Sequence, residues 1–327
     1  MTARVAVIGG GLSGLVCASM LRARFDVTVF DKARGVGGRT SVRREDAWRF
    51  DHGAPRLELG ASGLAAERAR WEAAGVIAAW QPRLCAATAA DRVTWVGVPG
   101  SNALAVHLAN GHRIITKARI SSLARRGDGW QLAADHDGSN TTFGPFEFLV
   151  VTAPTPQTLE LLASTEAETL AGALAPAVFA PCIVAMLAIQ GTSEYDEIRE
   201  LDGPLASAHK LDHRPGRKRF EGVDLWVAHG SETWSRARLE DDPDAAAGEL
   251  ATALNRHVTG SVVHQRGHRW RYARAVERIA APFGYDDSLR LGVAGDGFAA
   301  DPSTPAASRA VLSGRALAAH IIATTTA

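Results

Sequence analysis

The sequence is poor in cysteine, has no excess of either charge and contains no long apolar stretch. Its three cysteines, Cys17, Cys85 and Cys182, are odd in number and too widely spaced for metal-ligand motifs, which argues against a disulfide framework and fits a reducing cytoplasm. The 36 Lys and Arg residues against 35 Asp and Glu give a net charge of +1, so neither nucleic acid nor an anionic membrane is an expected partner. Apolar runs fall short of the ~18 residues of a membrane span, and glycines interrupt the N-terminal run too soon for a signal peptide. We therefore expect a soluble, cytoplasmic protein.

The sequence also lacks internal repeats, a low-complexity linker and a Gly-x-Ser-x-Gly motif. It contains no cluster of metal ligands, so we expect no metal centre. At about 150 residues per domain, the 327 residues predict roughly two domains, and without a linker these should interleave along the chain. Glycine is the informative excess, because 32 residues exceed the roughly 7% usual in proteins.

The first glycine cluster forms a dinucleotide-binding pattern. The apolar run 4–8 predicts a buried parallel strand, and Gly9, Gly11 and Gly14 follow as G-x-G-x-x-G before a helical repeat of apolar residues. Gly9 permits the tight turn from strand to helix, and Gly11 lets a pyrophosphate approach the backbone. Gly14 lets the helix pack against the sheet.

Two further features complete this unit. The helix N-terminus, at Leu12 and Ser13, offers free N–H donors and partial positive charge to phosphates. Asp31 ends a second predicted strand 17 residues after Gly14, close to the ~20 expected of an acid that binds the adenosine ribose. Strand, glycines, helix, strand and acid occur in the order that dinucleotide binding requires.

A second glycine cluster favours FAD over NAD. Lys32 follows the acid, and Gly37, Gly38 and Arg39 come shortly after it. Paired glycines and an arginine bring backbone N–H groups and a guanidinium to the same pyrophosphate from its other side. Noncovalently bound FAD is therefore the predicted cofactor.

The C-terminal end gives an independent indication. A strand-like run over 289–294 ends in Gly295 and Asp296, and a helical stretch over 308–322 follows. Ligands of α/β sheets lie beyond the carboxyl ends of the strands, so Asp296 is placed to accept hydrogen bonds from the FAD ribitol. The following helix would direct its N-terminus at the pyrimidine edge of the flavin.

Together these motifs resemble the FAD-dependent amine oxidase superfamily and, within it, the bacterial renalase-like flavoproteins. The resemblance rests on the Asp31-Lys32 and Gly37-Gly38-Arg39 segments, on Asp51-His52-Gly53-Ala54 and on the Gly295-Asp296 end, and it runs from about residue 4 to 322. It also rests on the Trp-Val-Gly-x-Pro-Gly segment at 95–100, Trp-Val-Ala-His at 226–229, Trp-Ser-Arg at 234–236 and His-Arg-Trp-x-Tyr-Ala at 268–273.

The resemblance implies further site residues and a reaction. Gly53 and Ala54 would contact the flavin, and backbone at Arg119 and Ile120 would meet the adenine. The implied reaction is oxidation of isomeric dihydronicotinamide dinucleotides by hydride transfer to flavin N5, with reoxidation by molecular oxygen. Two departures leave the substrate open: Pro55-Arg56-Leu57, where the family has Gln and aromatics, and Ser308-Arg309, where it has Glu-Gly.

The candidate catalytic residues lie on the substrate side. His229, at a strand end, could orient a ring amide. Trp270 and Tyr272 alternate on one strand face and could stack on flat rings. Arg56 could clamp an anionic substrate, and Arg269 and Arg271 are weaker candidates for the same task. Two alternatives remain: an amine or amino-acid oxidase, and an FAD-binding protein without turnover.

The predicted fold class is α/β, with an FAD-binding Rossmann-like parallel sheet, a β-meander over 111–153 and an inserted α+β substrate domain. Residues 1–58, 100–158 and 286–327 would form the FAD-binding domain, and 59–99 and 159–285 the substrate domain. A helix should begin after Asp242, with Pro243 at its first position. The charged stretch His209–Glu221 lacks periodicity and predicts a solvated loop, although its five Lys and Arg residues could touch an anionic substrate or partner.

Overall fold

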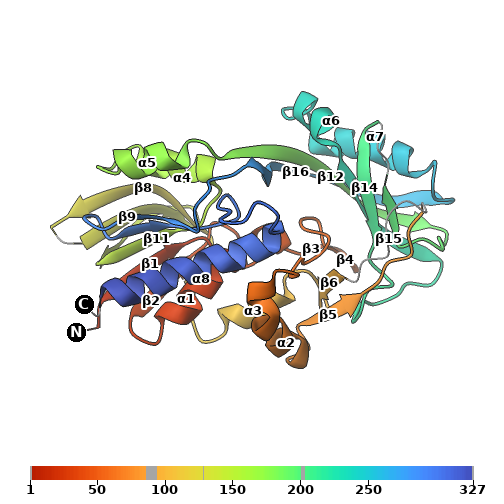
Figure 1. The fold of residues 1–327 in the computed structure, drawn as a ribbon. Coiled ribbons are helices and arrows are strands. Elements are labelled where there is room, and N and C mark those ends of the chain that lie inside the picture. The colour runs from red at the N-terminus through yellow and green to blue at the C-terminus, as the bar shows by residue number, and fades with distance from the viewer. Residues whose placement is uncertain (1, 86–93, 128, 200–202, 326–327) are drawn as a thin grey trace.

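The computed structural model describes residues 2–85, 94–127, 129–199 and 203–325. Figure 1 shows an elongated molecule with a layered parallel sheet at one end and an antiparallel sheet at the other, connected by the long strands β12 (Val178–Gln190) and β16 (Ser261–Glu277). The two chain termini lie together at the parallel-sheet end. No helix within the described residues is long and apolar enough to cross a membrane.

The parallel sheet draws its strands from both ends of the chain. Its order is β17-β18-β11-β1-β2-β7, and all neighbours are parallel except the edge strand β17. The central strands are short apolar runs buried on both faces, as parallel strands between helical layers are. Their bounds are β17 Gly284–Asp286, β18 Leu291–Val293, β11 Phe148–Val151, β1 Arg4–Ile8, β2 Asp26–Phe30 and β7 Arg113–Ile115.

Helices and a meander cover this sheet. Helices α1 (Leu12–Leu21) and α8 (Ala306–Thr324) pack together along one face, where Gly314 lets α8 approach α1 so closely that a Cβ would lie 2.2 Å from the Ser13 carbonyl oxygen. The meander consists of β8 (Ala118–Arg126), β9 (Gly129–His136) and β10 (Ser139–Phe146). The prediction that residues 113–115 belong to it was wrong, because β7 pairs in parallel with β2 at the sheet edge. Helices α4 (Thr155–Leu162) and α5 (Glu168–Leu174) follow the meander.

The antiparallel sheet has the order β13-β14-β15-β12-β16. Its remaining strands are β13 (Glu197–Arg199), β14 (Leu205–Lys210) and β15 (Val223–Gly230), and helices α6 (Glu232–Ala237) and α7 (Pro243–Leu254) cover one face. The predicted start of α7 is confirmed, since the Asp242 side chain accepts a hydrogen bond from the Asp244 N–H at 3.1 Å. The predicted α/β fold class is confirmed, whereas the domain boundaries stay a prediction.

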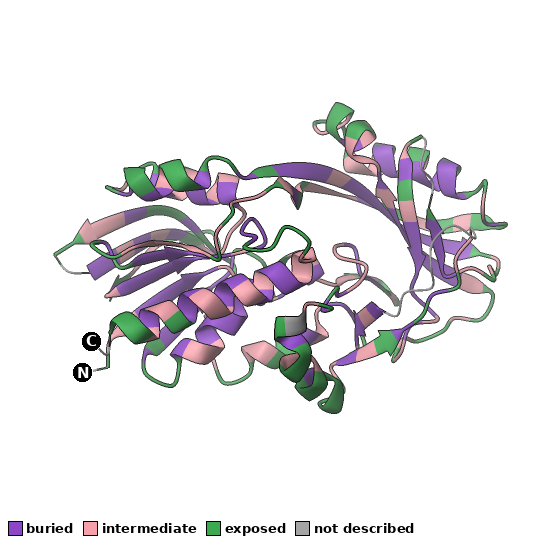
Figure 2. Cartoon of the chain, viewed as in Figure 1, coloured by how far each residue is buried: buried purple, intermediate pink, exposed green. Residues whose placement is uncertain are grey.

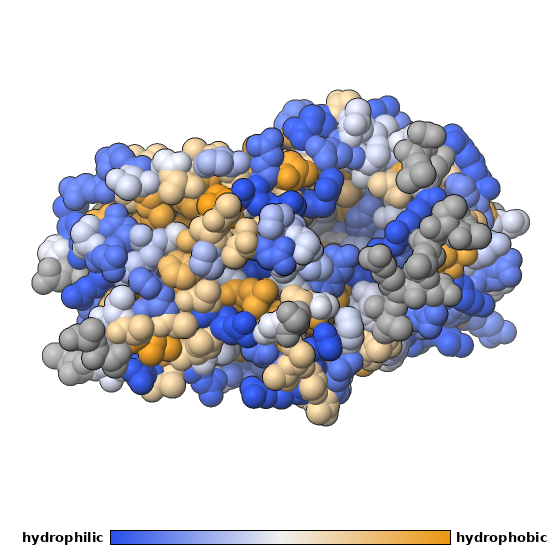
Figure 3. Space-filling model, in the orientation of Figure 1, coloured by the Kyte–Doolittle hydropathy of each residue, from blue (hydrophilic) through white to orange (hydrophobic). Residues whose placement is uncertain are grey.

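Short elements lie between the two sheets. They are η1 (Gly38–Thr40), β3 (Arg43–Glu45), β4 (Trp48–Phe50), η2 (Ser62–Leu64), α2 (Ala65–Ala73), β5 (Ile77–Trp80), β6 (Thr94–Gly97) and α3 (Ala103–Ala109). Figure 2 shows that burial is concentrated in the strands of both sheets and in the inward side of α8. Figure 3 shows a hollow on one face of the molecule, between the N-terminal end of α8 and the antiparallel sheet.

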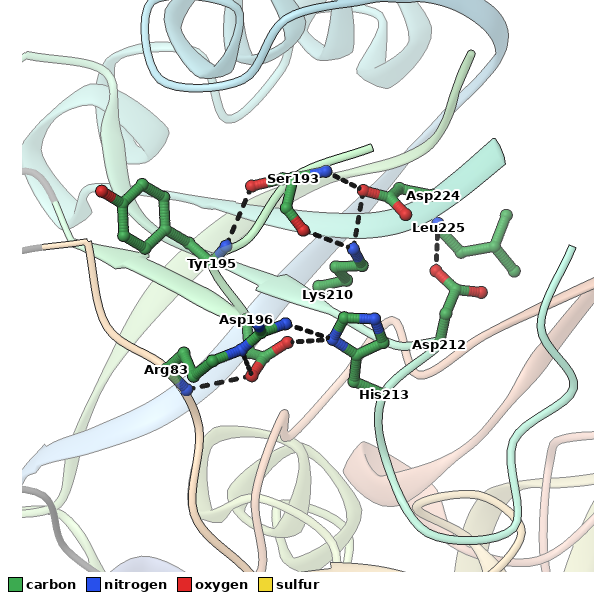
Figure 4. A network of polar contacts seen from close by, with 9 residues as sticks. All are labelled: Arg83, Ser193, Tyr195, Asp196, Lys210, Asp212, His213, Asp224 and Leu225. Atoms are coloured by element: carbon green, nitrogen blue, oxygen red, sulfur yellow. Dashed lines mark hydrogen bonds and ion pairs between the residues drawn. The ribbon is translucent and has the colours of Figure 1, made fainter. Parts of the chain in front are cut away.

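The prediction of a solvated loop over His209–Glu221 was wrong for four of its nine charged or titratable residues. His209 and Lys210 belong to β14, and they are buried together with Asp212 and Arg214. Figure 4 shows how part of this charge is neutralised: the Lys210 ammonium lies 2.8 Å from Asp224 Oδ2 and donates to the Ser193 carbonyl at 2.8 Å. Strand pairing of β14 with β15 carries His209 and Lys210 inside, and Asp212 accepts from the Leu225 N–H of β15, which the absence of a periodic pattern did not reveal.

Burial of Asp212 has a consequence for stability. Burial, reinforced by the nearby Asp224, raises the pKa of Asp212 from 3.8 to about 6. The folded state therefore favours the protonated Asp212 carboxyl. The resulting contribution to the free energy of unfolding is complete at pH values below the pKa of Asp212 in the unfolded chain. It is lost as pH rises through the pKa of Asp212 in the folded protein.

We expect Asp212→Asn to be more stable than the parent protein at pH 8, by about 3 kcal/mol at most, with the difference shrinking towards pH 4. Chemical denaturation at a series of pH values between 4 and 8 measures this. Asp137→Asn removes an exposed carboxyl and serves as the control. A difference for Asp212→Asn that stays constant with pH would contradict the assignment.

Candidate functional site

The turn between β1 and α1 uses its three glycines in three different ways. Gly9 has φ +114°, and a Cβ there would lie 2.5 Å from Thr152 Oγ1. A Cβ at Gly14 would lie 2.0 Å from the Gly9 carbonyl oxygen, so this glycine is needed for packing. At Gly11, by contrast, a Cβ would meet nothing within 4 Å. Gly11 therefore borders open space, as a glycine approached by a phosphate should.

The N-terminus of α1 is suited to an anion. Its first turn, Leu12 to Leu15, contains no acid, and Gly11 at the N-cap has no side chain to satisfy the free N–H groups. Leu12 is buried, and the buried Ser13 hydroxyl has no hydrogen-bond partner among the described residues. The helix dipole and unpaired N–H donors together favour a phosphate at this position.

Asp31 lies beside this turn at the end of β2. Its two carboxylate oxygens accept from the backbone N–H groups of Gly10 and Ala33, each at 2.7 Å. Burial raises the pKa of Asp31, although these two hydrogen bonds and the charge of Lys32 oppose the rise. A carboxylate has about four acceptor positions, so Asp31 retains capacity for a ribose hydroxyl.

Ile120, which is predicted to contact the adenine, lies close to Asp31 in the fold. The Ala118 N–H at the start of β8 donates to the Asp31 carbonyl at 2.9 Å, and the predicted adenine contact Ile120 follows two residues later. The exposed Lys32 donates to Gln157 at 3.3 Å instead of turning towards the glycines.

The second glycine cluster meets the C-terminal segment. Gly37 and Gly38 have φ angles of +124° and +53°, which L side chains rarely adopt. They position Arg39, whose guanidinium makes a two-pronged ion pair with Asp296, with Nη1 at 2.9 Å from Oδ2 and Nη2 close to Oδ1. Gly295 has φ +156°, and a Cβ there would meet nothing within 4 Å. The structure thus brings together residues 257 positions apart that the sequence assigned to one cofactor.

Gly53 and Ala54 pack directly on Arg39. The Ala54 N–H donates to the Arg39 carbonyl at 2.7 Å, and a Cβ on Gly53 would lie 1.9 Å from the same oxygen. Only glycine permits this approach. The loop predicted to contact the flavin is therefore fixed to the loop predicted to contact the pyrophosphate.

His229 connects the antiparallel sheet to this loop. Its Nε2 lies 2.9 Å from the Gly53 carbonyl, an acceptor, so Nε2 carries the proton. Burial lowers the pKa of His229 to about 4, so the ring is neutral near pH 7. Its buried Nδ1 has no hydrogen-bond partner among the described side chains and backbone groups, and it can accept one. His229 is therefore positioned next to the predicted flavin contacts.

The two predicted aromatic residues flank the same region but have different neighbours. Trp270 stacks on His52 with ring centroids 5.2 Å apart and donates from Nε1 to the His52 carbonyl at 2.8 Å. Tyr272 contacts Phe179 edge to face, and the Arg39 guanidinium lies over the Phe179 ring. A bulge in the β12–β16 pairing interrupts the register between Ala180 and Cys182. The pair therefore does not form one stacking surface: Trp270 belongs with His52 and Tyr272 with Phe179.

Arg56 is held by an acid that the sequence analysis missed. The carboxylate of Glu197, on β13, is fully buried and lies 3.4 Å from Arg56 Nη2 and 2.6 Å from Arg199 Nε. His209 Nδ1 lies 3.6 Å from the other carboxylate oxygen, and burial holds the pKa of His209 well below its usual value. Arg56, Glu197, His209 and His229 form a polar cluster beside Gly53. No local motif marks Glu197, which is placed by sheet pairing.

The other departures from the family pattern have structural contacts. The Ser308 hydroxyl donates to the Glu58 carbonyl at 2.7 Å, and Arg309 Nε donates to the Asp296 carbonyl at 2.9 Å. The first bond connects the first turn of α8 to the segment at Glu58, and the second connects it to the Asp296 loop. Arg269 and Arg271 bind the carbonyl of Leu239 and the exposed Glu240, away from the cluster.

The residues present fit an FAD molecule. Gly11 and Gly295 leave space at the backbone, Ser13 has an unpaired hydroxyl, and Arg39, Asp31 and Asp296 supply the polar partners that phosphate, ribose and ribitol require. Within the described part of the chain, no group of three or more His, Cys, Asp or Glu residues could hold a metal ion.

Comparison with known proteins agrees with this geometry. Residues 7–68 match the NAD(P)-binding Rossmann-like domain family. A segment of 51 residues is 39% identical to 4,4'-diapolycopen-4-al dehydrogenase of Metabacillus indicus and covers 15% of this chain and 10% of that enzyme. The match therefore spans a small fraction of the relative's length.

Solved structures share the fold over nearly the whole chain. A protein from Exiguobacterium sp. 255-15, classed provisionally as a protoporphyrinogen oxidase, superimposes with a TM-score of 0.74 at 10% identity and covers 99% of both chains. Putrescine oxidase bound to putrescine gives a TM-score of 0.70 at 10% identity, again covering 99% of both. An oxidoreductase from Methanosarcina mazei gives 0.70 at 12% identity, covering 99% of this chain and 100% of that one. The chain has the fold of these oxidases.

We expect Glu197→Gln to destabilise the protein by about 2 kcal/mol, because it leaves the Arg56 and Arg199 guanidiniums without their shared buried counter-charge. Urea denaturation at pH 7 measures the loss. Glu194→Gln, at an exposed position in the same segment, is the matched control and should change stability by less than about 0.5 kcal/mol. Equal effects of the two substitutions would show that Glu197 neutralises no buried charge.

Proposed function

We propose that this protein is an FAD-dependent oxidoreductase, specifically an oxidase that transfers a hydride from a small molecule to the flavin. The observation that carries the proposal is the junction of Arg39 with Gly53 and Asp296, which brings the predicted phosphate, flavin and ribitol contacts to one place. The Rossmann-like domain match and the oxidase fold support it. Its three unpaired cysteines favour the cytoplasm as its location.

The residues have separate tasks in this proposal. The α1 N-terminus, Ser13 and Arg39 hold the pyrophosphate, Asp31 the ribose and Asp296 the ribitol. FAD, when bound, supplies the chemistry by accepting a hydride at N5 and returning electrons to oxygen. The His229 Nε2–H donates to the Gly53 carbonyl and so positions the loop that is predicted to contact the flavin.

For the substrate, we propose an isomeric dihydronicotinamide dinucleotide, as the resemblance to renalase-like flavoproteins implies. Hydride loss from a dihydropyridine gives an aromatic ring directly, so the reaction requires no general base. This fits a cluster in which burial lowers the pKa of both histidines, His229 is bonded to the Gly53 carbonyl and His209 Nε2 is bonded to the Ser207 hydroxyl. Arg56, with 21% of its side chain exposed beside Gly53, supplies positive charge for a diphosphate.

An amine or amino-acid oxidase is the second candidate. Putrescine oxidase has the same fold over its whole length. Arg56 would then clamp a substrate carboxylate, at the cost of competing with Glu197 for the guanidinium.

For the cofactor, we expect the purified protein to be yellow because it holds noncovalent FAD. We expect Gly11→Ala to lower the affinity for FAD by at least about tenfold, since the methyl group would occupy space that the pyrophosphate needs. Equilibrium titration of the apoprotein with FAD, followed by flavin absorbance, measures this. Gly60→Ala, where a Cβ also meets nothing within 4 Å, is the matched control. Colourless protein that gains no visible absorption with FAD would contradict the proposal.

For the reaction, anaerobic mixing with borohydride-reduced NAD, with ordinary NADH and with a panel of amines separates the candidates. Rapid bleaching by the isomer mixture alone supports the dinucleotide, bleaching by amines alone supports the amine oxidase, and no bleaching indicates a protein without turnover. We expect Arg56→Ala to raise the KM for an anionic substrate about tenfold, a loss of about 1.4 kcal/mol. Arg271→Ala, at an exposed arginine paired with Glu240, is the control and should leave KM unchanged.

A further inference from the structure

Arg309, in the first turn of α8, is a buried cation whose hydrogen-bond partners are all uncharged. The residue is 6% exposed. Its Nε donates to the Asp296 carbonyl oxygen at 2.9 Å, and its Nη1 donates to the Thr304 carbonyl oxygen at 2.5 Å. Within the described part of the chain, Arg309 forms no ion pair. Buried arginines are rare unless a carboxylate neutralises them, so the charge of Arg309 requires an explanation.

The acids near Arg309 do not supply that counter-charge. Asp296 attracts it, but the Asp296 carboxylate is already bound in the two-pronged pair with Arg39. Glu58 attracts it as well, and this residue is exposed to solvent, which screens its charge. Two guanidiniums and one buried carboxylate therefore meet at Asp296, which leaves an excess of one positive charge beside the predicted ribitol contact.

One nitrogen of the guanidinium remains available. Arg309 Nη2 donates to no group among the described residues, since only Nε and Nη1 have partners. It is also absent from the fully enclosed polar atoms that lack a partner, unlike Nη2 of the buried Arg214, so it keeps accessible surface. A buried cation with a free donor is costly, and an adjacent anion would recover part of this cost.

The N-terminus of α8 adds positive charge at the same place. Its first turn contains no acid, and Pro305 at the N-cap has no side chain that could accept from the free N–H groups. The partial positive charge of a helix is confined to this turn. Figure 1 shows this end of α8 directed towards the middle of the molecule, between the two sheets. It is the end that the sequence predicts to face the pyrimidine edge of the flavin.

We propose that Arg309 raises the reduction potential of the bound flavin by supplying a fixed positive charge near its pyrimidine edge. The inference rests on the proposed function. A hydride leaves the substrate with two electrons and one proton and forms a bond to N5, so the flavin gains one negative charge, which gathers on the pyrimidine edge. A cation that is already in place stabilises this charge without reorganisation. Because the resembling flavoproteins have glycine at this position, the effect belongs to this chain and not to the fold.

The reduction potential of the FAD-bound protein, measured anaerobically against a dye of known potential, tests the inference. We expect Arg309→Gln, which keeps a donor and loses the charge, to lower the equilibrium constant for two-electron reduction at least about tenfold, or about 30 mV. Arg309→Lys keeps the charge and should stay within about threefold of the parent protein. Arg315→Gln removes an arginine further along α8 that pairs with Glu67, and it is the matched control that should leave the potential unchanged.

The affinities for oxidised and reduced FAD separate this role from a merely structural one. Loss of a charge that acts on the reduced flavin weakens binding of reduced FAD at least about tenfold more than binding of oxidised FAD. Loss of a clamp on the Asp296 loop weakens both equally and leaves the potential unchanged. Arg309→Met also removes the charge while keeping the aliphatic bulk, and it takes the place of Arg309→Gln should that variant not fold.

The outcomes distinguish the inference from the function on which it rests. A parent protein that binds no FAD would overturn both. A parent protein that binds FAD, with a potential that Arg309→Gln and Arg309→Met leave unchanged, would overturn the inference alone. A potential that falls equally in Arg309→Lys and Arg309→Gln would assign the effect to the hydrogen bonds with the Asp296 and Thr304 carbonyls, which also overturns it.

Discussion

The close contact between the backbone of Gly53 and the carbonyl of Arg39 is the constraint on which the rest of the site depends. The Ala54 N–H satisfies this carbonyl, and His229 satisfies the Gly53 carbonyl. These two hydrogen bonds join the loop at Arg39 to the loop at Gly53, and the loop at Gly53 to strand β15 of the antiparallel sheet. Because Arg39 also pairs with Asp296, a segment near each end of the chain and the antiparallel sheet meet at one point. Any side chain at position 53 would separate them.

The second constraint is electrostatic. Asp51 precedes this contact and is 2% exposed; burial alone would raise its pKa, but the Arg217 and Arg214 guanidiniums hold the pKa below its usual range. Both arginines come from the segment at 211–220, so a loop of the antiparallel sheet neutralises a charge next to the predicted flavin contacts. A buried carboxylate without these partners would cost several kcal/mol. Charge pairing therefore adds to the apolar packing of the neighbouring Phe50 against the antiparallel sheet in holding these segments together.

The sequence permitted prediction of the features that are local. The strand, glycines, helix and acid between Arg4 and Asp31 are adjacent along the chain, and the structure contains each of these elements where the pattern placed it. Glu197 and the buried part of 209–221 were missed, because their burial is decided by pairing of β13, β14 and β15, and charged residues in a short strand look like a loop. Likewise, alternation predicted one face for Trp270 and Tyr272, and a bulge that no local pattern indicates gave them different neighbours.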